Sequence, residues 1–89
     1  MFCNNDLLAA GVLFECRERG LKVPRQMAVM GLGDMPIAAA ASPRLTTIRV
    51  HRRRMGEIAA RLLMERLDGK QAGPITIDIG FEVVRRSSA

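Results

Sequence analysis

The sequence is poor in aromatic residues: it has no tryptophan, no tyrosine and only three phenylalanines among 89 residues. Proteins that bind single-stranded nucleic acids stack bases on aromatic side chains, so a stacking surface of that kind is excluded. Cysteine and histidine are also scarce. Cys3 and Cys16 are too few for a disulfide scaffold and too far apart for a C-x-x-C pair, and with His51 they complete no common zinc set. We therefore expect two reduced thiols, no metal and no cofactor.

Long hydrophobic runs are missing as well. No apolar stretch approaches the roughly 20 residues that span a bilayer. The amino terminus has no basic region followed by an apolar core, which a secretory signal needs. We therefore expect a cytoplasmic protein that has no membrane partner.

What the sequence does contain is typical of a globular chain, with 48% hydrophobic and 26% charged residues in a length that allows one domain at most. The net charge of +5 is uneven, because residues 49–89 carry nine basic and five acidic side chains. Arg49 and the run Arg52-Arg53-Arg54 account for most of this excess. Such a cluster is usually a solvated face; the alternative is a small basic protein that binds nucleic acid through it.

Turn-forming residues separate segments of different hydrophobic periodicity. Helices are predicted over residues 7–19 and 53–68, a helical turn over 37–41, and strands over 27–30, 45–50, 75–79 and 81–84. Residues 2–4 have the character of a strand end, and the tail 85–89 is expected to be frayed. The predicted fold class is therefore α/β with an incomplete doubly wound parallel sheet. Two helices cover such a sheet poorly, which indicates a piece of a larger domain.

The predicted helix 7–19 is apolar on two sides. At about 100° per residue, one face gathers Leu8, Val12, Leu13 and Cys16. A second face, roughly opposite, gathers Leu7, Ala10 and Phe14. One face is expected to pack on the sheet, so the other needs cover from another lobe or another chain.

Polar residues follow two of the predicted strand ends. Asn5 and Asp6 follow the stub at 2–4, and Gly33 and Asp34 follow the strand at 27–30. Ligands of open α/β sheets bind outside the carboxyl ends of the strands, so these residues are candidate ligand contacts. The alternative is that they only cap a helix and form turns, which need the same residue types.

Motifs for catalysis are missing from the sequence. The pair Gly31-x-Gly33 lacks the third glycine of a dinucleotide loop, and there is no Walker sequence and no G-x-S-x-G. Ser42, His51 and Asp34 form no recognisable nucleophile, base and orienter set. We therefore expect no enzymatic role.

Five motifs follow one another along the chain: N-D-x-x-A-x-G from Asn5, G-L-x-V-P from Gly20, V-x-G-L-G-D from Val29, P-x-L-T-T-I from Pro43, and G-x-x-A-x-x-L-L from Gly56. In this order and spacing they resemble the lactose/galactose-repressor (LacI/GalR) family of bacterial transcription regulators, with Leu32 in place of the family's usual aromatic residue. The variant Gly-x-Gly-Asp at residues 31–34 and the stretch 14–20 look most like the gluconate-utilisation repressors.

The resemblance implies that residues 1–89 are the C-terminal fragment of an effector-binding and dimerisation domain with the fold of periplasmic binding proteins (type I). The helix-turn-helix head of the family is absent from these residues, so operator DNA would be bound only through that missing domain. The family fold also implies that the chain crosses to the other lobe after about Val50 and that its last strand crosses back. The alternative is a sugar-binding or transport protein of the same fold.

The resemblance also assigns roles to single residues. Asn5 matches a position that contacts the sugar effector. The usual second contact, an aspartate, falls on Gly33, which suits an anionic effector such as a sugar acid, and Asp34 is the neighbouring acid. The face of Leu7, Ala10 and Phe14 coincides with the dimer-interface helix of the family, so a homodimer is expected.

Overall fold

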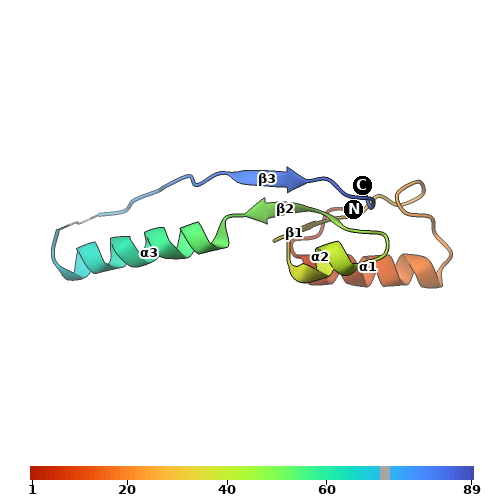
Figure 1. Ribbon diagram of the computed structural model, residues 1–89, viewed down its shortest axis with the longest axis horizontal. Coiled ribbons are helices and arrows are strands. Elements are labelled where there is room, and N and C mark those ends of the chain that lie inside the picture. Colours follow the sequence, from red (N-terminus) through yellow and green to blue (C-terminus); the bar gives the residue numbers. More distant parts are fainter. Residues whose placement is uncertain (71–72) are drawn as a thin grey trace. The chain divides into compact units, whose positions relative to one another are not determined.

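The structure is a computed structural model that describes residues 1–70 and 73–89 (Figure 1). Its elements, in chain order, are α1 (Asp6–Glu18), β1 (Met30–Leu32), α2 (Pro36–Ala40), β2 (Thr46–Val50), α3 (Arg52–Leu67) and β3 (Phe81–Val84). The chain divides into two compact units, one formed by Met1–Val50 with Phe81–Ala89 and the other by His51–Gly80. The division falls at Val50, where the resemblance implied a crossing.

The sheet of the first unit has the strand order β1-β2-β3. β1 and β2 are parallel, with Met30 opposite Thr46, and Phe2 forms an isolated parallel bridge to Met30. β3 is antiparallel to β2, so the incomplete sheet is mixed, with β1 and β2 parallel as predicted and β3 running in the opposite direction. The reason is that Val50 and Phe81 are register partners: the chain returns at the residue opposite the one from which it leaves, and must run back in the opposite direction.

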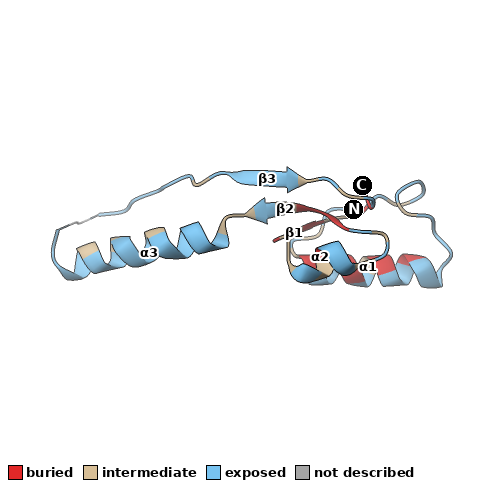
Figure 2. Cartoon of the chain, in the orientation of Figure 1, coloured by how far each residue is buried: buried red, intermediate tan, exposed pale blue. Residues whose placement is uncertain are grey.

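The core of this unit lies between α1 and the sheet. Its buried residues are Ala9, Leu13, Val29, Ala38 and Leu45. In Figure 2 the buried positions of α1 lie along one side of the helix.

α1 is rotated relative to the expected orientation. Leu8 lies on the helix face that was expected to pack on the sheet, but this residue is 56% exposed. The residues Asp6, Ala9 and Ala10 are buried instead. The physical reason is that Asp6 is hydrogen-bonded inside the unit, and small alanine side chains let the helix lie close to its neighbours.

The carboxyl-terminal tail is ordered, so the expectation of a frayed tail is wrong. Ser88 is fully buried; its hydroxyl donates to the Val29 carbonyl at 2.6 Å and accepts from the Thr46 amide at 2.8 Å. These bonds join the tail to the amino ends of β1 and β2, so the tail closes that side of the sheet.

In the second unit, no residue of α3 is buried. Met55, Ile58 and Leu62 line a shallow apolar groove together with the isoleucines of the segment 75–79. That segment was predicted to be a strand, but its residues form no strand, because they pair with no other strand in the described chain. Leu63 and Leu67 of α3 are exposed.

Among the described residues, no helix combines the length and the apolar character needed to cross a bilayer.

Candidate functional site

Asn5 lies directly before α1, between the bridged residues at the amino terminus and the helix. Its backbone is extended and its Oδ1 accepts a hydrogen bond from the Leu8 amide at 2.8 Å, as an N-cap does. Because Oδ1 is occupied, the side-chain amide nitrogen is left as a donor, and within the described part of the chain it has no hydrogen-bond partner. Asn5 is therefore both a cap and a half-buried donor at the edge of the sheet.

The loop after β1 contains Gly33 and Asp34, both in left-handed backbone conformations with φ of 126° and 51°. Glycine adopts the first value without strain, and aspartate is one of the few other residues that tolerate the second. The Gly33 amide donates to the Ile48 carbonyl at 2.8 Å, and the Asp34 amide donates to the Thr47 hydroxyl at 3.3 Å. The loop is thus fixed against β2.

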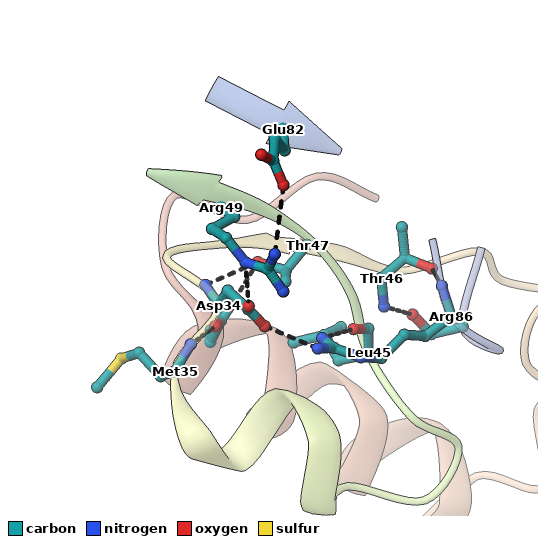
Figure 3. Close-up of polar contacts among 10 residues, drawn as sticks. Asp34, Met35, Leu45, Thr46, Thr47, Arg49, Glu82 and Arg86 are labelled. Carbon is teal, nitrogen blue, oxygen red and sulfur yellow. Dashed lines mark hydrogen bonds and ion pairs between the residues drawn. The ribbon is translucent and has the colours of Figure 1, made fainter. Parts of the chain in front are cut away.

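Asp34 is clamped between two arginines (Figure 3). Arg49 Nε donates to its Oδ2 at 2.8 Å, and Arg86 Nη2 donates to its Oδ1 at 2.8 Å. The bond from Arg49, followed by that from Arg86, lowers the pKa of the Asp34 carboxyl below its ordinary value. The same pair raises the pKa of Arg49 further above its ordinary value.

The two arginines are themselves held by other partners. Arg86 also donates to the Leu45 carbonyl at 3.0 Å, and Arg49 donates to Glu82 on β3 at 3.2 Å (Figure 3). The cluster of Asp34, Glu82, Arg49 and Arg86 therefore contains two negative and two positive groups, and its formal charge is zero. Asp34 has both of its oxygens occupied and acts as a structural anchor of the loop.

The two predicted pairs of polar residues are brought to one edge of the sheet. Oδ2 of Asp6 accepts from the Met35 amide at 2.6 Å, so the start of α1 is bonded to the loop that contains Gly33 and Asp34. This contact joins residues 29 positions apart. Both pairs were predicted to lie at carboxyl strand ends. The structure bears this out for the pair after β1, although that strand ends two residues later than expected.

Two residues of the site were missed from sequence. Arg49 was grouped with the arginines at 52–54, and Arg86 was placed in a frayed tail. The register of β2 and β3, which sets Arg49 opposite Glu82, was the signal that could have separated Arg49 from its neighbours. No local pattern marks Arg86, whose partner Asp34 is 52 positions away.

The apolar face expected on the first helix is only partly exposed. Leu7 and Phe14 on α1 are 58% and 57% exposed, whereas Ala10 is 2% exposed and is covered by this chain itself. Leu8 adds a further exposed apolar side chain. Among the described residues no three His, Cys, Asp or Glu side chains are grouped so that they could hold a metal ion.

Ligands of open α/β sheets bind outside the carboxyl ends of the strands, which is the edge where this sheet gathers its polar residues. The sequence matches the periplasmic binding protein-like domain family over residues 1–89. The chain belongs to this family.

The similar proteins of known sequence are transcription regulators. The chain is 44% identical over 87 residues to the HTH-type transcriptional regulator GntR of Pseudomonas aeruginosa. The alignment covers 98% of this chain and 25% of that relative. It is also 36% identical over 88 residues to the HTH-type transcriptional repressor PurR of Aliivibrio fischeri. That alignment covers 99% of this chain and 26% of the relative. The resemblance to LacI/GalR regulators is confirmed, and the chain spans about a quarter of the length of these relatives.

Solved structures show the same similarity. The transcription regulator GntR from Chromobacterium violaceum is 38% identical with a TM-score of 0.84, over 98% of this chain and 32% of that one. The transcriptional regulator CelR, solved as a complex with cellobiose, is 31% identical with a TM-score of 0.93. The match covers 99% of this chain and 27% of that one. A lac repressor dimer bound to operator is 26% identical with a TM-score of 0.89. The match covers 99% of this chain and 30% of that one.

Proposed function

We propose that this chain forms the C-terminal part of the effector-binding and dimerisation domain of a LacI-type transcription regulator, a repressor of genes for carbohydrate utilisation. In this role it works in the cytoplasm and performs no catalysis. The observation that carries the proposal is the Asn5 side chain at the carboxyl edge of the sheet, with its Oδ1 used for capping and its amide nitrogen left as a donor. Such a donor suits the hydroxyl and carboxylate oxygens of a sugar or a sugar acid.

The loop after β1 is compatible with an anionic effector such as gluconate. Gly33 supplies no carboxylate, and both oxygens of Asp34 are bonded to arginines, so neither residue presents an unpaired negative charge to a ligand. The Arg49 side chain, next to this loop, is 45% exposed. A sugar acid would therefore meet donors rather than a repelling carboxylate.

The dimer of this regulator would form through α1. Leu7 and Phe14 present apolar surface outward, and Ala10 lies beneath them against the chain's own interior. In a two-fold interface the same patch meets itself, so a single helix face is enough to build it. Operator DNA would be bound through a helix-turn-helix domain outside these 89 residues.

The test uses a chimera in which this chain replaces the matching segment of the Pseudomonas aeruginosa regulator. Calorimetry is expected to show gluconate binding, and neutral glucose serves as the comparison for the charge argument. Asn5→Ala is expected to weaken gluconate binding by roughly 1–3 kcal/mol, because a buried polar contact loses its partner.

Asn5→Asp separates the two roles of this residue. Aspartate is an equally good N-cap, so α1 stays capped, but the substitution removes the amide donor and adds a negative charge. We expect Asn5→Asp to lose gluconate binding while the chimera unfolds at the same urea concentration. Full affinity in both variants would mean that Asn5 is only a cap and would overturn the proposal.

A further inference from the structure

Asp6, the first residue of α1, is a fully buried carboxylate. Its Oδ1 accepts from the Thr47 hydroxyl at 2.6 Å, and its Oδ2 accepts from the Met35 amide at 2.6 Å. Within the described residues it forms no ion pair, so these two short bonds and the amino-terminal end of the helix dipole stabilise its charge. A buried carboxylate is costly unless its oxygens are bonded, so the position of Asp6 is set by these two partners.

Thr47 extends the same network to the next amide of the loop. Its hydroxyl donates to Asp6 and accepts from the Asp34 amide at 3.3 Å, so one side chain serves both residues. Two consecutive amides of the loop after β1 therefore donate to this pair: the Asp34 amide to Thr47 and the Met35 amide to Asp6. This pair joins the start of α1, the second residue of β2 and the loop through buried side chains of Asp6 and Thr47.

Gly31 on β1 shows how closely Asp6 is packed. A Cβ atom built at Gly31 would lie 2.3 Å from Asp6 Oδ1 and 3.2 Å from Asp6 Cα. No side chain fits in that space, so the carboxylate and the start of α1 rest directly on the backbone of β1. This close packing restricts the Asp6 carboxylate, and Asp6 directly follows Asn5 in the chain.

We propose that Asp6 is a positioning residue of the effector site: through its bonds to Thr47 and Met35 it holds Asn5 and the loop 33–35 in a fixed relation. The inference rests on the proposed function for the identity of the ligand. It makes Asp6 and Thr47 determinants of effector affinity, although neither needs to touch the effector. A ligand held between Asn5 and this loop would lose affinity when the two move independently.

The first experiment uses the 89-residue chain and needs no effector. Amide hydrogen exchange is measured by NMR in Asp6→Ala, Thr47→Val and Thr47→Ser. Asp6→Ala removes the acceptor of the Met35 amide, and Thr47→Val removes that of the Asp34 amide while keeping the shape of the side chain. We expect each amide to exchange about tenfold faster in its variant, and Thr47→Ser to restore the slow rate.

Ser88→Ala is the matched control. It also removes two buried hydrogen bonds, at the amino ends of β1 and β2, but neither of them involves the Asp34 or the Met35 amide. It is expected to lower global stability comparably and to leave the exchange of the Asp34 and Met35 amides at the rate that global unfolding predicts. If Asp6→Ala does not fold, Thr47→Val alone carries the comparison.

The second experiment measures gluconate affinity in the chimera described above. Thr47→Val is expected to weaken binding at least about tenfold more than Ser88→Ala at matched stability, with Thr47→Ser close to the parent. Equal losses in Thr47→Val and Ser88→Ala would overturn the positioning role. If the parent chimera binds no gluconate, the proposed function fails. Amide exchange alone then tests the positioning role of Asp6. Unchanged exchange rates in Asp6→Ala and Thr47→Val would overturn that role.

Discussion

At the residue scale, the two aspartates at the carboxyl edge of the sheet are stabilised in different ways. Asp6 is fully buried and accepts from a hydroxyl and a backbone amide. Asp34 is mostly buried and is bonded to the guanidinium groups of Arg49 and Arg86. Only the second arrangement has opposite charges in contact.

The pKa of Asp34 is lowered in the folded chain, so the folded state keeps this carboxylate charged at a pH where the unfolded state binds a proton. The stability that it contributes is present above the ordinary pKa near 3.8 and is lost as pH falls through the lowered value. Asp34→Asn, which tolerates the left-handed backbone, is expected to reduce stability at neutral pH and to flatten its decline in acid. Urea unfolding from about pH 6 to about pH 2 measures both effects.

Glu82→Gln is the control for this prediction, because the Glu82 carboxylate is paired with the exposed Arg49 and is itself 55% exposed. Its effect on the acid decline should be small, since exposed ion pairs contribute little. An unchanged acid decline in Asp34→Asn would show that the arginine clamp does not stabilise the fold.

Two glycine-to-alanine substitutions test the close packing at Asp6. Gly31→Ala places a methyl group on the Asp6 carboxylate and is expected to lower the free energy of unfolding by about 1–3 kcal/mol, as overpacking does. Gly11→Ala, in the middle of α1 with no atom within 4 Å of the added carbon, should raise it by up to about 1 kcal/mol through helix propensity. Urea unfolding compares the two, and a stable Gly31→Ala chain would contradict the packing at Asp6.

At the scale of elements, the helices differ in how much of their surface the chain covers. α1 buries one side against the sheet and leaves Leu7 and Phe14 exposed, whereas α3 buries no residue. Exposed apolar helix faces of this kind mark interaction surfaces. For α1 the proposed function names the partner as a second copy of the chain.

Phe14→Glu tests that partner. The substitution places an unpaired charge in the proposed two-fold interface, which costs several kcal/mol and shifts dissociation by more than about a hundredfold. Sedimentation of the chimera at micromolar concentration is expected to show monomers. Val83→Glu on β3 is the control, since Val83 is as exposed as Phe14 at 57%, and it should leave the dimer intact. A dimer that persists in Phe14→Glu would show that this face of α1 is not the interface.

The elements themselves were predicted from sequence to different degrees. The helices expected at 7–19 and 53–68 are observed at Asp6–Glu18 and Arg52–Leu67, each displaced by one residue. Caps and the 3.6-residue period are local signals, so they survive without knowledge of the fold. The alternating segment 75–79 forms no strand, because a strand needs a neighbour and alternation cannot supply one.

At the scale of the whole molecule, the arrangement of helices bears on DNA binding. A strand separates each helix from the next along the chain, so none of the described helices forms the short-turn pair of a helix-turn-helix. The net charge of +5 is modest and lies mainly beyond residue 48. We therefore expect the 89-residue chain to bind operator and scrambled DNA alike, through charge alone.

Gel-shift titrations at two salt concentrations test this expectation. Binding that rests on phosphate contacts falls steeply as salt rises and does not distinguish sequences. Clear preference for an operator by the 89-residue chain would contradict the prediction and would favour a small basic nucleic-acid-binding protein.

The sequence by itself determined the family, the helices and the residue types at the carboxyl edge of the sheet. These features rest on motif spacing, helix periodicity and capping residues such as Asn5, which are encoded over short stretches. Local order is therefore readable in the sequence before any packing is known.

Only the tertiary structure decided which of those residues work together. Asp6 and Thr47 are 41 positions apart, and Asp34 and Arg86 are 52 positions apart. Their bonds depend on the register of β2 and on the antiparallel return of β3, which no local pattern specifies. From sequence, Asp6 was therefore interpreted as a capping or turn residue and Arg86 as part of a frayed tail. In the folded chain Asp6 is buried at the start of α1, and Arg86 is bonded to Asp34 in the candidate site.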